Sequence, residues 1–119
     1  MIPITVQGAA NKEIISYEFD LRYDPKVIQP LDNTAVLKNT VSRGLTVVVN
    51  AKEPGLLRVV VYGPSPIDQD GVLLKLRFTA VGQVGALTPL TFERMMFNEG
   101  DPSTTVTDGE IELSYAISN

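Results

Sequence analysis

The sequence predicts an all-β fold, an antiparallel β-sandwich of the jelly-roll type with about eight strands. Apolar and polar residues alternate along several stretches, as they do on a strand with one face on a core and the other in water. Glycine, proline, asparagine and aspartate separate these stretches at short intervals, as turns require. Helical spacing is weak and confined to residues 25–36, where Pro30 and the pair Asp32-Asn33 oppose a stable helix.

The first predicted strand covers residues 2–6 and ends before Gly8, and the second covers residues 15–23. The second strand alternates without exception, with Ile15, Tyr17, Phe19, Leu21 and Tyr23 at odd positions and Ser16, Glu18, Asp20 and Arg22 at even positions. Because successive side chains on a strand point to opposite faces, we expect the odd set to face the core. Asp24-Pro25 then makes a turn, and a short strand is predicted at residues 27–28.

Residues 45–50 and 56–62 are predicted to form a hairpin. Both runs contain several valines, which favour strands, and Pro54-Gly55 between them is a typical turn pair. The sequence Gly-Pro-Ser-Pro at residues 63–66 predicts the end of the second of these strands, since proline cannot donate a hydrogen bond to a neighbouring strand.

In the C-terminal half, Asp70-Gly71 precedes an alternating strand over residues 72–78, and Asp108-Gly109 precedes a last strand over residues 110–115. Between them lie two separate predicted strands at residues 87–92 and 95–98. Alternation in the second of these places Met95 and Phe97 on one face and Met96 on the other.

The length of 119 residues suits one domain, and we expect residues 1–119 to form a single β-sandwich. The net charge of −4 and the scattered positions of the ten Lys and Arg residues do not favour nucleic acid as a partner. The chain contains no Cys and no His, so it lacks a thiolate nucleophile, an imidazole base and the usual zinc ligands. No apolar run is long enough to span a bilayer. No signal peptide precedes the first strand, so we expect a secreted parent protein to carry this chain as one module.

Three segments, in this order along the chain, carry a family resemblance. Residues 15–28, ISYEFDLRYDPKVI, are similar to the cohesin strand that ends in a Tyr-Asp-Pro turn followed by a short strand. Residues 70–78, DGVLLKLRF, are similar to the cohesin strand introduced by Asp-Gly-Val, and residues 97–111 resemble the loop and Asp-Gly turn before the last strand. The chain therefore resembles cohesins, the modules that receive dockerins in cellulosomes and related assemblies. The motif residues themselves have structural roles, because Asp24 can accept backbone N–H groups in the turn and Pro25 fixes φ.

The resemblance implies a non-catalytic module that binds a dockerin-like partner in an extracellular, bacterial assembly, without a cofactor or metal. It implies a secreted or cell-surface location as part of a larger protein. One departure is large, because cohesins begin with an additional strand that this chain lacks. We expect the vacated place beside residues 110–115 to be filled by residues 115–119, or by a second chain in a strand-exchanged homodimer.

The resemblance also implies a binding face on one side of the sandwich, where the partner would contact the outward residues of three strands. These predicted partner-binding residues are Ser16, Glu18, Asp20, Val48, Asn50, Arg58, Val60 and Tyr62. Family members often carry Asn and Asp where this chain has Ser16 and Glu18, so the hydrogen-bonding reach of its face differs. Tyr and Arg are favoured anchors at interfaces, and apolar residues on a solvent face often mark partner sites.

Other interpretations of these residues are weaker. Glu18 and Asp20 lie about 7 Å apart along a strand, a spacing that suits a glycosidase pair, but a flat strand face offers no cleft, so we predict no catalytic residues. The oxygen-rich residues 98–102 with Asp108 could ligate calcium, yet their order fits no EF-hand loop and they are ordinary turn residues. A carbohydrate-binding module would present a strip of exposed aromatics, whereas this chain has no Trp and leaves only Tyr62 and Tyr115 off the predicted core. A structural spacer in a bacterial surface protein stays open as a further alternative.

Overall fold

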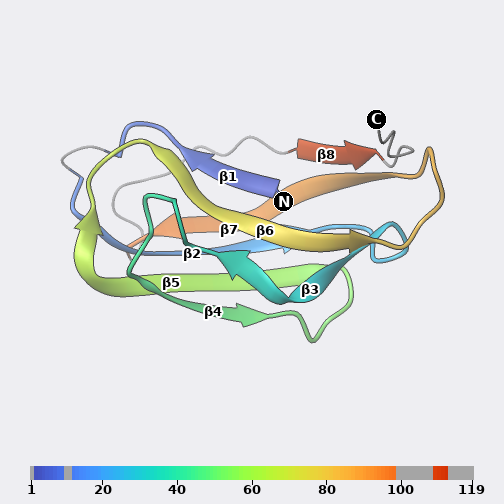
Figure 1. The fold of residues 1–119 in the computed structure, drawn as a ribbon, viewed down its shortest axis with the longest axis horizontal. Coiled ribbons are helices and arrows are strands. Elements are labelled where there is room, and N and C mark those ends of the chain that lie inside the picture. Colours follow the sequence, from blue (N-terminus) through green and yellow to red (C-terminus); the bar gives the residue numbers. More distant parts are fainter. Residues whose placement is uncertain (1, 10–11, 99–108, 113–119) are drawn as a thin grey trace.

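The computed structural model describes residues 2–9, 12–98 and 109–112, which form eight strands and no helix (Figure 1). The strands are β1 (Ile2–Val6), β2 (Ile14–Arg22), β3 (Ile28–Val36), β4 (Thr46–Asn50), β5 (Leu56–Ile67), β6 (Gly71–Ala80), β7 (Leu87–Phe97) and β8 (Gly109–Glu112). All strand pairs are antiparallel, so the predicted all-β, antiparallel class is confirmed. No helix in these ranges is long and apolar enough to cross a membrane.

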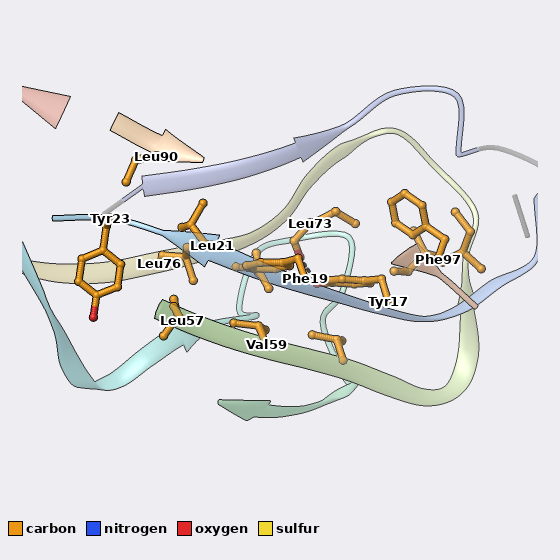
Figure 2. Packing of buried hydrophobic residues seen from close by; sticks show 14 of the residues in the cluster. Tyr17, Phe19, Leu21, Tyr23, Leu57, Val59, Leu73, Leu76, Leu90 and Phe97 are labelled. Atoms are coloured by element: carbon orange, nitrogen blue, oxygen red, sulfur yellow. Dashed lines mark hydrogen bonds between the residues drawn. The ribbon is translucent and has the colours of Figure 1, made fainter. Parts of the chain in front are cut away.

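The strands form two layers, one of three strands in the order β1-β6-β3 and one of five in the order β4-β5-β2-β7-β8 (Figure 1). The core lies between the layers, and Figure 2 shows the side chains of β2 and β5 meeting those of β6 there. Among the largest side chains without appreciable exposure are Tyr17, Phe19, Leu21, Leu57, Val59, Val61, Leu73, Leu74 and Leu76. The predicted inward face of β2 is therefore confirmed from Tyr17 onward.

Aromatic contacts and one buried hydroxyl pair add specificity to this core. Three ring pairs meet edge to face, and Tyr23 with Phe78 joins the two layers at a centroid distance of 5.3 Å. At the other end of β2, the Tyr17 hydroxyl lies 2.8 Å from Ser42 Oγ and donates to the Leu73 carbonyl at 3.3 Å. Burial raises the pKa of Tyr17, so this hydroxyl stays protonated well above the usual range of a tyrosine.

The turn chemistry predicted around Asp24 and Gly55 is confirmed. Asp24 Oδ1 accepts the N–H of Lys26 at 2.9 Å, and the Asp24 carbonyl accepts the N–H of Val27 at 3.0 Å. The β4–β5 hairpin turns at Gly55, whose φ of 85° is unfavourable for other residues. Its carbonyl accepts the N–H of Tyr23 at 3.0 Å, and a Cβ would lie only 3.1 Å from the Tyr23 carbonyl.

The predicted stop at residues 63–66 is wrong, because β5 continues to Ile67. The proline argument fails here because these residues leave the ladder without ending the strand. Ser16 of β2 pairs with Tyr62 and Ile14 pairs with Ile67, so β5 uses five positions where β2 uses two. Pro64, Ser65 and Pro66 are exposed and have no paired residue on β2, so the missing N–H groups of the prolines cost no hydrogen bond to β2.

Two other predicted boundaries are also wrong. Residues 87–92 and 95–98 form one strand, β7, whose register against β2 shifts by one residue. Phe92 and Met95 both pack against the core and lie three positions apart, so Glu93 and Arg94 both stand on the outer face. The alternation breaks at this shift, and that break gave the appearance of two strands. The short strand predicted at residues 27–28 has the wrong extent, because β3 runs from Ile28 to Val36. Pro30 lies next to a second shift of register, between β3 and β6.

The last strand, β8, pairs with β7 over Leu87–Leu90. In the described parts of the chain, β8 has only β7 as a neighbour and β1 has only β6. Residues 113–119, on which the expected filling of the vacated place depends, lie outside the described residues. The strand-exchanged homodimer therefore stays a prediction.

Candidate functional site

The eight predicted partner-binding residues lie on the outer face of the five-stranded layer, the face turned away from the core. The pairing of β4, β5 and β2 gathers them into three consecutive cross-strand rows. Read from β4 to β2, the rows are Thr46, Tyr62 and Ser16; Val48, Val60 and Glu18; and Asn50, Arg58 and Asp20. Thr46 completes the first row and was absent from the predicted set. Because opposed residues on adjacent strands lie about 5 Å apart, the rows make one continuous surface.

One end of this surface is apolar. Val48, Val60 and Tyr62 are 53%, 37% and 48% exposed, although their neighbours Val59 and Val61 are fully buried. These three side chains adjoin across β4 and β5, so they form a single apolar cluster instead of scattered exposures. Contiguous apolar area of this kind on a soluble domain is a common mark of a contact site.

Paired charges run from the middle row, where Glu18 lies, to the other end of the surface. Glu18 Oε1 accepts a hydrogen bond from Arg94 Nη2 at 2.8 Å, and Asp20 Oδ1 lies 3.6 Å from Arg58 Nε. Arg22 donates from Nε to Glu93 Oε1 at 2.6 Å, and this hydrogen bond is the main cause of its raised pKa. These carboxylates are therefore already engaged by cations of the same chain, which leaves neither Glu18 nor Asp20 placed as a free catalytic base.

Strand β7 contributes outer-face residues that were not in the predicted binding set. Met96 stands opposite Glu18, and Arg94 stands opposite Asp20 in the β2–β7 register. They extend the second and third rows by one strand beyond β2. The missed signal was the sequence Phe92 to Met95, in which two apolar residues enclose two charged ones, as expected at a one-residue shift of register.

The surface is slightly hollowed at one corner. A hollow of about 140 Å³ lies at one corner and is lined by Asn50, Lys52, Glu53, Leu56 and Arg58. Pockets for drug-sized ligands usually measure roughly 300–1,000 Å³, so this hollow is small for an organic substrate. The surface is better suited to a macromolecule that lies across it.

Metal ligation finds no support in the described residues, where no group of three His, Cys, Asp or Glu side chains converges. Of the oxygen-rich stretch considered for calcium, only Asn98 is described, and its side chain bonds backbone groups at the start of β2. Residues 99–102 and Asp108 lie outside the described ranges.

Comparison with known proteins places these observations in a family. The family model described as the cohesin domain matches residues 1–113 of this chain. No curated protein sequence matched.

Several solved cohesins have a similar fold. The sixth cohesin of scaffoldin B from Acetivibrio cellulolyticus, solved in complex with a mutant Cel5 dockerin, has a TM-score of 0.77 at 20% identity, covering 94% of this chain and 86% of that chain. The OlpA cohesin of Clostridium thermocellum, solved with the dockerin Doc918, has a TM-score of 0.72 at 18% identity over 93% and 85% of the two chains. A non-cellulosomal cohesin from the archaeon Archaeoglobus fulgidus has a TM-score of 0.71 at 16% identity over 95% and 78%.

Proposed function

This chain belongs to the cohesin family, and from that premise we propose that it is a non-catalytic module that binds a dockerin-type module through the outer face of β4, β5, β2 and β7. The observation that carries the proposal is the exposed apolar cluster of Val48, Val60 and Tyr62 on paired strands. The dockerin complexes among the similar structures support the class of partner.

The physical character of the face suits a protein partner better than a small molecule. Tyr62 and Arg58 belong to the residue types that dominate interface energetics. Because the rows are fixed by backbone pairing between strands, association would require little change of backbone. The aromatic strip of a carbohydrate-binding module is not present in the described residues, where Tyr62 is the only aromatic among the exposed large hydrophobic side chains.

We propose a secreted or cell-surface location, with this module as part of a larger assembly. Family membership supports this location, because cohesins are typically modules of extracellular scaffold proteins. The assembly need not be a cellulosome, since one of the similar structures is described as a non-cellulosomal cohesin.

The proposal is tested by measuring binding of the purified module to a panel of dockerin modules by calorimetry, with the dockerins of the two similar complexes included. Tyr62→Ala removes most of an exposed ring, of which about 100 Å² would be buried on binding. At about 25 cal/mol per Å², the loss is about 2.5 kcal/mol, or about seventyfold in Kd. Tyr62→Phe keeps the ring and is the matched control.

Glu18→Lys is a second variant in the middle of the face. It breaks the contact with Arg94 and places two cations side by side, so we expect weaker binding with a nearly unchanged Tm. If both Glu18→Lys and Tyr62→Ala bind the dockerin with wild-type affinity, the binding site lies on another face. Loss of folding in either would assign these residues a structural role.

A further inference from the structure

The alternation of β2 is interrupted at its start. Ile14 and Tyr17 are both buried, each 1% exposed, although they lie three positions apart. On a regular strand residues an odd number of positions apart point to opposite faces, so the chain must gain one residue between them. Both intervening residues, Ile15 and Ser16, therefore stand on the outer face, and Ile15 is 52% exposed. The predicted core position of Ile15 is wrong for this reason.

Asn98, which follows β7, holds this interruption in place. Its Oδ1 accepts the N–H of Ile15 at 2.8 Å and the N–H of Ser16 at 3.3 Å. Its Nδ2 donates to the Glu13 carbonyl at 3.2 Å, and its own N–H donates to the Ser16 carbonyl at 2.8 Å. One side chain thus replaces the ladder bonds that a neighbouring strand would make. Asn98 has a φ of 48°, a conformation that Asn tolerates better than most residues.

The interruption brings Ile15 to the apolar end of the binding face. Ser16 is paired with Tyr62 across β2 and β5, so Ile15 is adjacent in sequence to the row that holds Tyr62. Val60 and Val48 follow in the next row. A partner that lies across this end meets aliphatic and aromatic groups, whereas Glu18 in the middle row and Asp20 in the third row are engaged by Arg94 and Arg58.

We infer that Ile15 is a further contact residue for the partner and that Asn98 is a positioning residue that presents it. This inference rests on the proposed function and specifies the partner more closely. The dockerin-type module that fits would place aliphatic side chains over Ile15, Tyr62 and Val60, where the surface offers apolar area and few free charges.

The test measures Kd of the wild type and of Ile15→Ser for the dockerin that binds most tightly in the panel described above. We expect Ile15→Ser to raise Kd about tenfold, since it removes most of a half-exposed aliphatic side chain from the interface. Val84→Ser is the matched control, because Val84 is 51% exposed but lies outside β2, β4 and β5. We expect this control to leave both Kd and Tm unchanged.

The role of Asn98 is tested through Ile15. Asn98→Ala removes both acceptor contacts and should raise Kd as Ile15→Ser does, while Asn98→Asp keeps an acceptor oxygen and should restore most of the affinity. In the double variant the two losses should not add, because Asn98 acts by presenting Ile15. Additive losses would overturn the positioning role.

The outcomes separate the inference from the proposed function. If Tyr62→Ala weakens binding while Ile15→Ser leaves Kd unchanged, the inference is wrong and the binding face stands. If no dockerin of the panel binds the wild type, the proposed function fails, and the inference fails with it. An equal rise in Kd for Ile15→Ser and Val84→Ser would also overturn the inference, since the effect would not belong to the face.

Discussion

The buried contact between Tyr17 and Ser42 makes a sharp test of the core. The two oxygens lie 2.8 Å apart, and the exposed fractions of the two residues are 1% and 0%. Tyr17→Phe deletes one hydroxyl and leaves that of Ser42 buried without its Tyr17 contact. An orphaned buried hydroxyl costs about 1–2 kcal/mol, and a domain of this size loses about 4 °C of Tm per kcal/mol. We therefore expect Tyr17→Phe to lower Tm by about 4–8 °C.

A double-mutant cycle distinguishes this mechanism from a general loss of packing. Ser42→Ala should cost less than Tyr17→Phe, because the Tyr17 hydroxyl keeps the Leu73 carbonyl at 3.3 Å. The double variant removes both hydroxyls and leaves neither of them orphaned, so its cost should fall below the sum of the two single costs by about 1 kcal/mol. Urea denaturation followed by circular dichroism gives the free energies of unfolding. Tyr62→Phe, at a half-exposed tyrosine, is the control and should be nearly neutral.

Two results would refute this reasoning. If the free energy of unfolding of Tyr17→Phe lies within roughly 0.3 kcal/mol of the wild-type value, as for a neutral surface change, the hydroxyl contact makes no net contribution to stability. If the two single costs add within the same margin, the two hydroxyls are not energetically coupled.

Two further predictions concern pH and a close backbone approach. Because burial raises the folded-state pKa of Tyr17 above its unfolded value near 10.0, the contribution of Tyr17 to the pH dependence of stability should be flat below about pH 10. Above that pH it should lower the free energy of unfolding by about 1.4 kcal/mol per pH unit. Tyr17→Phe should remove that part of the slope, and equal slopes in the two proteins would contradict it. Gly63→Ala should destabilise by about 1–2 kcal/mol, since its Cβ would lie 2.5 Å from Leu45 Cδ2 and 3.3 Å from Leu45 Cα. Gly109→Ala is the control, because a Cβ there meets nothing within 4 Å. Equal free energies of unfolding for the two variants would contradict the prediction, since Leu45 would then adjust to the added Cβ without cost.

The strands with uninterrupted alternation could be predicted from the sequence, because a two-residue period depends only on neighbours along the chain. Tyr17, Phe19 and Leu21 face the core as their spacing predicts. The turn at Asp24 follows from local hydrogen bonding in the same way. Ser16, Glu18 and Asp20 on the outer face of β2 could be predicted too, since they alternate with the buried Tyr17, Phe19 and Leu21.

The features that could not be predicted depend on contacts between distant residues. Ile15 stands outward because Asn98, 83 positions later in the chain, bonds its N–H group. Pro64 has no N–H group, and this costs a hydrogen bond only if a residue of β2 lies opposite. The register between β2 and β5 decides whether one does. Likewise, Glu18 has a cationic partner only because the register places Arg94 near it. A local pattern holds no information on any of these pairings.

The proposed binding face has an apolar end, and its ion pairs begin in the middle row and continue to the other end, which has a consequence for recognition. Exposed ion pairs contribute roughly 0–1 kcal/mol each, so the pairs made by Glu18, Asp20 and Arg22 add little to the stability of the sandwich. A partner that covers them without replacing their hydrogen bonds must desolvate them, at a cost in affinity. The apolar end, in contrast, gains free energy from any aliphatic surface that fits. Affinity is therefore expected to come from the end with Tyr62, while the charged end discriminates against partners whose polar groups do not match its rows.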